Sequence, residues 1–162
     1  MQHDKLPDLD KADPTMIYQN NLRSAKATDT YIARGDADGE TFVPSFTYHG
    51  FRFVEITNMN VTAEDITLLH FHSAVEPKAT VSFSSDTLNR IQALAVGAQR
   101  SNMMTVATDC DQRDERLGWM GDMDLSSDSM CLNFDCGAFA KSFVRAMDDE
   151  MEDSGALPDV VP

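Results

Sequence analysis

The chain has 162 residues, of which 42% are hydrophobic and 25% charged, a composition typical of a globular protein with room for one domain or for parts of two. Its 27 acidic residues against 13 basic ones give a formal net charge of −14, and this charge repels phosphate, so we expect no nucleic-acid partner. We expect no membrane role either, because no apolar run approaches the roughly 20 residues of a spanning helix.

The first predicted element is a lead-in over residues 1–19. It carries Pro7, Pro14 and several aspartates with little periodicity, a pattern that indicates turns or poor order. Its first residues also lack the basic and then apolar order of a secretory signal. No compartment follows from this segment, so both a cytoplasmic and a secreted location stay open.

Residues 20–76 favour β-strands. Four short runs of β-branched and aromatic residues are separated by turn signals such as the stretch 35–39. In one run, Phe51 and Phe53 flank Arg52, which is the period of two expected when one face of a sheet is buried. We therefore predict part of an antiparallel β-sandwich. The predicted strands are 30–33, 41–43, 51–56 and 66–72.

Residues 77–162 change to a helical period. Ser84 or Ser85 can cap a first helix, and apolar residues then recur at spacings of three and four. A second helix is predicted over about 133–151, followed by Gly and Pro signals that end it. The residues expected to face a core are Leu88, Ile91, Leu94, Ala95 and Ala98 in the first helix and Phe139, Phe143 and Met147 in the second.

Between the two predicted helices lies an acidic stretch, residues 108–122. It contains five carboxylates, two arginines and the only tryptophan of the chain. Carboxylates at this density repel one another, and such crowding is one of the few ways to keep an acid protonated near neutral pH. Trp119 offers a flat apolar face on which one side of a sugar ring can lie. The pattern indicates an active-site surface that binds a sugar. The alternative is a solvated network of surface ion pairs.

Three cysteines, Cys110, Cys131 and Cys136, are an odd number, which excludes a complete set of disulfides within the chain. We interpret them as buried free thiols, because free cysteine packs as a small hydrophobic residue. The sequence contains no Cys-x-x-Cys pair, in which two residues separate the cysteines, so a structural zinc site is not expected.

No other metal or cofactor is predicted. His70 and His72 have the spacing of one face of a strand, which favours a structural role over a pair of zinc ligands. The stretch 122–133 resembles the opening of a calcium loop. It has Ser127 where the sharp turn needs glycine and Asn133 where a bidentate glutamate is needed.

The acidic stretch is similar to the catalytic signature of the inverting α-L-rhamnosidases, glycoside hydrolase family 78. Three flanking segments resemble the same family in the same order: 46–54 the end of its β-sandwich, 99–102 the tail of the first barrel helix, and 155–162 the loop after the second. The resemblance covers roughly residues 20–162. The residues that carry it in the acidic stretch are Thr108, Asp109, Gln112, Arg113, Asp114, Glu115, Arg116, Leu117, Gly118, Trp119, Gly121 and Asp122.

The resemblance implies a mixed fold: an antiparallel β-sandwich fragment followed by the first helices of an (α/α)6 six-hairpin glycosidase barrel. The lead-in 1–19 would precede the C-terminal part of a concanavalin A-like sandwich at 20–76. The N-terminal part of the catalytic domain would occupy 77–162. A barrel of this kind needs about a dozen helices of roughly 12 residues each, so the chain is expected to be an internal piece of a longer enzyme.

The resemblance also implies an activity, the hydrolysis of terminal non-reducing α-L-rhamnose residues with inversion. Glu115 matches the general acid, and four residues match those that bind the sugar: Asp109, Arg113, Trp119 and Asp122. The substrate would be a rhamnose-containing glycoside or polysaccharide. Inversion needs a second carboxylate as base, and the family's base is a glutamate downstream of Pro162.

Two alternatives stay open. In the first, the chain is a catalytically inactive carbohydrate-binding or structural relic of such an enzyme. In the second, it belongs to a related six-hairpin glycosidase that acts on another sugar. The sequence predicts no aglycone, linkage or oligomeric state, because these depend on other segments.

Overall fold

The computed structural model describes residues 17–162, and residues 1–16 of the predicted lead-in lie outside them. Contacts divide the chain into two compact units. The first unit comprises the residues up to Leu68 together with Gln112–Asp114, and the second comprises Leu69–Asp111 and Glu115–Pro162. No helix among the described residues is both long enough and apolar enough to cross a lipid bilayer.

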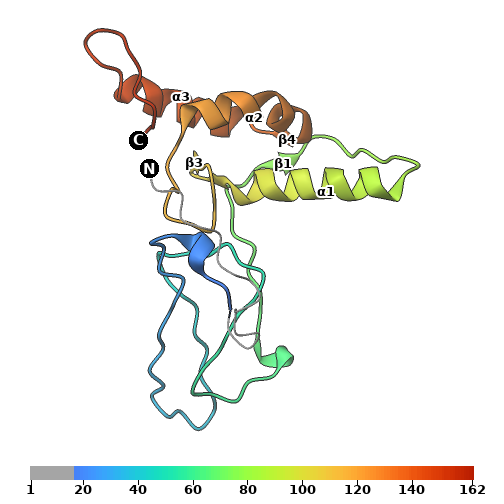
Figure 1. Ribbon diagram of the computed structural model, residues 1–162, viewed down its shortest axis with the longest axis vertical. Coiled ribbons are helices and arrows are strands. Elements are labelled where there is room, and N and C mark those ends of the chain that lie inside the picture. Colours follow the sequence, from blue (N-terminus) through green and yellow to red (C-terminus); the bar gives the residue numbers. More distant parts are fainter. Residues whose placement is uncertain (1–16) are drawn as a thin grey trace. The chain divides into compact units, whose positions relative to one another are not determined.

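The described part of the first unit runs as irregular chain (Figure 1). Its only regular elements are two short 3-10 helices, η2 at Asn20–Leu22 and η3 at Ala63–Asp65. The four predicted strands are therefore wrong as hydrogen-bonded elements. Strand formation needs a neighbouring strand that supplies the partner amides and carbonyls, and no described segment pairs with these runs. The strands predicted at 30–33, 41–43, 51–56 and 66–72 make no ladder.

The predicted turn at 35–39 is confirmed, and the carboxylate of Glu40 holds it. This carboxylate accepts hydrogen bonds from the amides of Arg34, Gly35 and Asp36 at 2.7–3.0 Å. The hydroxyl of Tyr31 donates to it as well. These bonds favour the charged form, and they lower the pKa of Glu40 to about 2, with the Tyr31 hydroxyl as the largest cause.

The second unit contains three helices: α1 at Asp86–Ser101, α2 at Met120–Asn133 and α3 at Gly137–Asp149. Two antiparallel pairs of short strands connect them. One joins β1 at Glu76–Pro77 to β4 at Phe134–Asp135, and the other joins β2 at Met103–Met104 to β3 at Val106–Ala107. The first predicted helix is confirmed, with Ser85 at its N-cap. The second begins at Gly137, four residues later than predicted.

Helix α2 was not predicted, because the acidic stretch and the residues after it were assigned to a loop. Its sequence contains three Asp, three Ser and one Gly, which are weak helix formers. Its apolar residues are spread around the helix, so no stripe at a period of 3.6 marks it. The calcium-like stretch lies within this helix, so it does not form a metal-binding loop.

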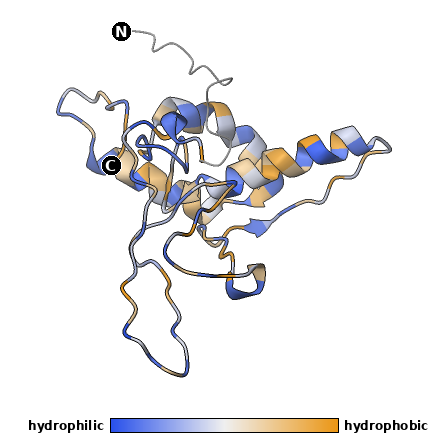
Figure 2. Cartoon of the chain, turned by 60° about the horizontal axis from the view of Figure 1, so that its bottom comes forward, coloured by the Kyte–Doolittle hydropathy of each residue, from blue (hydrophilic) through white to orange (hydrophobic). Residues whose placement is uncertain are grey.

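The core of the second unit gathers around four fully buried side chains, Met103, Phe134, Phe143 and Val161. Helix α3 packs Phe139 and Phe143 into it, as predicted. Helix α1 contributes no buried residue, so the prediction that its stripe faces a core is wrong for the described residues. Figure 2 shows hydrophobic segments along α1, and Leu94 is 73% exposed. A stripe of this kind needs a further layer of helices to bury it.

We expect the 162-residue chain, heated alone, to unfold over a broad range or without a visible transition. Large apolar side chains remain exposed in both units, with Ile32 at 84% and Leu125 at 88%, and surfaces of this kind favour association over a unique native state. Calorimetry together with near-ultraviolet circular dichroism measures the transition. A sharp, reversible transition with a large enthalpy would contradict the expectation.

Candidate active site

Asp109 is positioned by the residue before it, Thr108. The amide and the Oγ1 of Thr108 both donate to the backbone oxygen of Asn102, at 2.9 and 3.1 Å. Asn102 caps α1, and its side-chain Nδ2 donates to the carbonyl of Ala98 at 3.0 Å. Thr108 is only 8% exposed. A buried pair of hydrogen bonds to one carbonyl fixes the backbone at this point, so Asp109 is tied to the end of α1.

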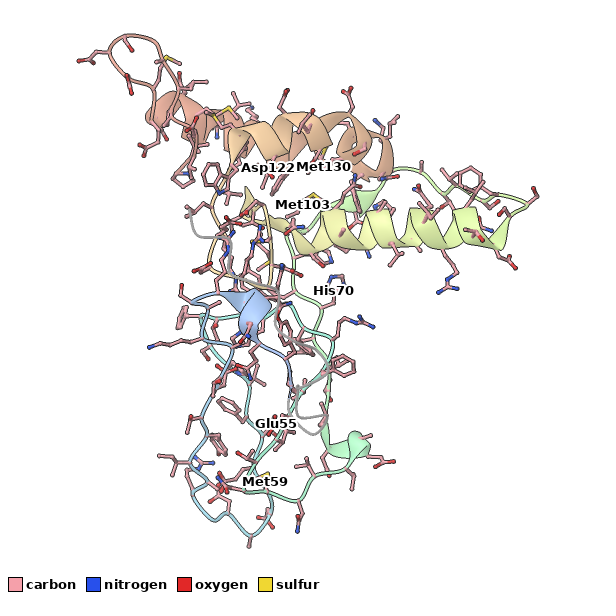
Figure 3. The ribbon with its side chains drawn as sticks, viewed as in Figure 1. Glu55, Met59, His70, Met103, Asp122 and Met130 are labelled. Carbon is pink, nitrogen blue, oxygen red and sulfur yellow. The ribbon has the colours of Figure 1, made fainter. Side chains whose placement is uncertain are left out.

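A pocket of about 170 Å³ lies between the C-terminal end of α1 and helix α2. Asp109 and Asp122 both line it, the first from the stretch after β3 and the second from the first turn of α2. Figure 3 shows Asp122 and Met130, a further lining residue, on α2. The other lining residues are Ala98, Gln99, Asn102, Ala107, Thr108, Met123 and Ser126.

One oxygen of the Asp109 carboxylate, Oδ1, is buried and has no hydrogen-bond partner among the described residues. Leaving a buried acceptor unsatisfied costs about 1–3 kcal/mol, and more when the group is charged. Native proteins seldom carry that cost without a functional reason. A ligand hydroxyl that donates a hydrogen bond to this oxygen would remove the free-energy cost.

Glu115 lies close to Asp109 but is not among the residues that line the pocket. One ligand atom each from Asp109, Cys110 and Glu115 falls within 4.8 Å of the others. A cluster of two carboxylates and a thiol could hold a metal ion, although acidic groups also gather without one. Asp109 and Glu115 are therefore close enough to act on the same bound group.

The second half of the acidic stretch is anchored by residues near the end of the chain. Val161 donates its amide to the carbonyl of Gly118 at 2.9 Å, and Met120 donates to Asp159 at 3.1 Å. Between these bonds, Trp119 forms a β-bridge with Val160. Trp119 therefore has a fixed backbone at the start of α2.

The Trp119 side chain is half-buried and does not belong to the hydrophobic core cluster. Its indole Nε1 is buried without a hydrogen-bond partner among the described residues. An indole N–H that is buried usually finds an acceptor. Trp119 does not line the pocket of Asp109 and Asp122.

Arg113 and Asp114 belong to the three residues that group with the first unit. The Asp114 carboxylate accepts hydrogen bonds from the Ser24 hydroxyl and, at 3.3 Å, from the Ser24 amide, and the Arg23 guanidinium lies 3.7 Å away. The Ser24 hydroxyl is the largest cause that lowers the pKa of Asp114. Asp114 is thus held ionised, which makes it a poor general acid.

The structure therefore brings together three of the five predicted residues. Asp109 shares a pocket with Asp122 and a cluster with Glu115. Trp119 does not line that pocket, and Arg113 groups with the first unit. The sequence contained Thr108 and Asn102 in its family-like segments, but nothing in their residue types indicated that one positions the other. Only the fold places the two side by side.

Two family models match the chain. The concanavalin-like domain of the bacterial α-L-rhamnosidases matches residues 6–72. Their six-hairpin glycosidase domain matches residues 76–162, more than half of the chain. The chain belongs to the bacterial α-L-rhamnosidase family. The predicted fold class, a sandwich fragment followed by the start of a six-hairpin barrel, is confirmed by these matches, even though the sandwich part forms no ladder of its own.

Solved α-L-rhamnosidases share this fold. The Streptomyces avermitilis enzyme complexed with L-rhamnose has a TM-score of 0.86 at 34% identity, over 90% of this chain and 14% of that one. The native Aspergillus terreus enzyme has a TM-score of 0.84 at 30% identity, over 93% and 18%. A curated Formosa agariphila α-L-rhamnosidase is 34% identical over 150 residues, 90% of this chain and 16% of the relative. The chain thus spans about a sixth of the length of these relatives.

Proposed function

We propose that the chain supplies the acid half of an α-L-rhamnosidase active site, which removes terminal non-reducing α-L-rhamnose from a glycoside or polysaccharide. The observation that carries the proposal is the unpaired buried oxygen of Asp109 in a pocket shared with Asp122 and close to Glu115. The pocket volume of about 170 Å³ is below the roughly 300–1,000 Å³ of sites for drug-sized ligands. That size fits a single sugar residue better than a longer glycan.

In this proposal Glu115 is the general acid that protonates the departing glycosidic oxygen. Support comes from the place of Glu115 beside Asp109, which lines the pocket. The adjacent carboxylate is the poorer candidate, because the Ser24 hydroxyl lowers the pKa of Asp114. Asp109 and Asp122 accept hydrogen bonds from the sugar hydroxyls. Two further sugar-binding residues are proposed on the family resemblance alone: Arg113 as a cation and Trp119 as an apolar wall.

The base of an inverting reaction lies elsewhere. Inverting carboxyl pairs stand about 6.5–9.5 Å apart, which leaves room for a water molecule. Asp109 and Glu115 approach within 4.8 Å, which is too close for that arrangement, so Asp109 is a binding residue and a carboxylate from another segment activates the water. The domain limits that go with this proposal are 20–76 for the sandwich part and 77–162 for the barrel part.

A hybrid enzyme tests the proposed function. In it, residues 20–162 replace the aligned segment of the Streptomyces avermitilis α-L-rhamnosidase, which supplies the rest of the enzyme. We expect hydrolysis of an aryl α-L-rhamnoside, with release of the inverted β-anomer visible by proton NMR. Asp109→Asn and Asp122→Asn should raise KM at least about tenfold, because each removes a charge-assisted hydrogen bond worth about 1.5–3 kcal/mol.

Three outcomes would contradict the proposal. A folded hybrid that binds L-rhamnose without hydrolysis would favour an inactive relic. A hybrid that cleaves another aryl glycoside in preference would favour a different sugar. Release of the retained α-anomer would make Asp109 and Glu115 a nucleophile and acid pair, since retaining pairs stand about 5–5.5 Å apart.

A further inference from the structure

Two of the three cysteines lie side by side where α2 ends and α3 begins. The Sγ atoms of Cys131 and Cys136 are 3.2 Å apart. Cys131 is in the last turn of α2 and is exposed, whereas Cys136 is at the N-cap of α3 and is only 3% exposed. Contact between an accessible thiol and a shielded one is the arrangement of a thiol that reacts first and a thiol that resolves the product.

The backbone around this thiol pair is held in place. Strand β4, between the two cysteines, pairs with β1, and its Phe134 is 1% exposed. The Lys78 amide donates to the carbonyl of Asn133 at 2.8 Å, and its Nζ donates to the carbonyl of Cys131 at 3.1 Å. The segment that carries the pair is therefore tied at both of its edges, and the two sulfurs stay near each other.

We propose that Cys131 and Cys136 are an oxidation site, at which a peroxide converts the two thiols into an intramolecular disulfide. The Cys131 thiolate attacks one peroxide oxygen, which breaks the O–O bond and gives a sulfenic acid and, from hydrogen peroxide, water. The Cys136 sulfur then attacks the sulfenic sulfur and expels a second water. Two thiols and one hydrogen peroxide become one disulfide and two waters, so electrons and atoms balance.

The order of these steps follows from the surroundings of each thiol. Burial, and then the hydrogen bond with Cys131, raise the pKa of Cys136 above its ordinary value. Cys136 is therefore slow to ionise and to meet peroxide, while Cys131 faces solvent. Once Cys131 is a sulfenic acid, its neighbour is within reach without diffusion.

Cys110 offers a comparison within the same chain. It is also buried, at 6% exposed, but its sulfur lies among the carboxylates of Asp109 and Glu115 and not beside a second thiol. No described thiol lies beside Cys110 to resolve a sulfenic acid. The disulfide site is thus distinct from the proposed sugar site and does not depend on the proposed function.

Thiol titration combined with peptide mapping of the hybrid enzyme, before and after brief treatment with hydrogen peroxide, tests the proposal for the cysteines of this chain. The three cysteines should give three titratable thiols in denaturant before treatment and one afterwards, and a thiol reductant should restore all three. Peptide mapping should find Cys131 and Cys136 in one linked peptide. Oxidation in concentrated urea should be slower by about tenfold or more, because the fold no longer holds the pair together and only loop closure favours it.

Matched variants make the outcome decisive. Cys110→Ser should start with two thiols and end with none, whereas Cys131→Ser should start with two and keep both. Because Cys131 is exposed, replacing it with serine should leave the fold unchanged. The peptide map of the unsubstituted protein identifies the linked cysteines without any variant. Retention of three thiols, a linked peptide that includes Cys110, or equal rates in urea and buffer would overturn the proposal.

Discussion

Glu115→Gln in the hybrid enzyme should slow the hydrolysis of an alkyl α-L-rhamnoside by about 10²–10⁴-fold, the usual contribution of a general acid. An activated aryl rhamnoside should be slowed much less, because its departing oxygen is weakly basic and leaves without a proton. Sugar binding should change little, since glutamine keeps the size and hydrogen-bonding capacity of the side chain. The measurement is kcat and KM for both substrates across a range of pH, where the variant should also lose the basic limb of the profile.

Asp114→Asn is the matched control for this prediction. Asp114 is the adjacent carboxylate, and Ser24 and Arg23 keep it ionised, so its amide variant should retain the preference of the original enzyme between the two leaving groups. Equal slowing of both substrates by Glu115→Gln, with the basic limb intact, would remove Glu115 as the acid. Asp122 would then be the next candidate, because it lines the pocket.

In the hybrid enzyme, Gly118→Ala should have the largest effect on the free energy of unfolding. A Cβ at this position would stand 1.9 Å from the carbonyl oxygen of Val161 and 3.0 Å from the Phe143 ring. Neither can yield cheaply, because one is backbone and the other is a fully buried core residue. Overpacking of a core costs about 1–3 kcal/mol, and here the hydrogen bond from Val161 to Gly118 is lost as well. We expect about 3 kcal/mol or more.

Hydrogen exchange at the Val161 amide measures that loss, because this amide is protected by its bond to Gly118. A cost of about 3 kcal/mol corresponds to more than a hundredfold faster exchange, since 1.36 kcal/mol is a factor of ten. The control is Gly97→Ala in α1, where a Cβ meets nothing within 4 Å. Alanine there should stabilise the helix by about 0.5–1 kcal/mol. Unchanged protection of Val161 in Gly118→Ala would show that the bridge can shift to admit a side chain.

The sequence predicted the parts of the fold that have a local cause. Helix α1 follows from a serine cap and an apolar stripe, and the turn at 35–39 follows from its glycines. Helix α2 could not be predicted in the same way, because its Asp, Ser and Gly residues favour caps and turns. The sequence pattern alone could not establish the four strands. Alternation of apolar and polar residues predicts which face of a strand is buried, but it does not show whether a partner strand is close enough to pair.

The candidate site was predictable as a set of residue types and not as a geometry. The acidic stretch indicated sugar chemistry, and the resemblance indicated roles. The sequence did not show that Asp109 and Asp122, thirteen positions apart in the chain, would line one pocket, because that depends on an unpredicted helix. It also did not show that Ser24, far away in the sequence, would hold Asp114 ionised, since such a contact arises only from tertiary structure.

The acidic stretch is fixed to the second unit at two separate points. Thr108 is bonded to the end of α1, and Gly118 is bonded to Val161. The residues between these anchors form no regular element. A change in the length of this intervening run therefore leaves Asp109 on one anchor and the start of α2, with Asp122, on the other. In the proposed site, a longer or shorter segment around Glu115 would change which leaving groups this side chain reaches, while the pocket lined by Asp109 and Asp122 would keep its dimensions.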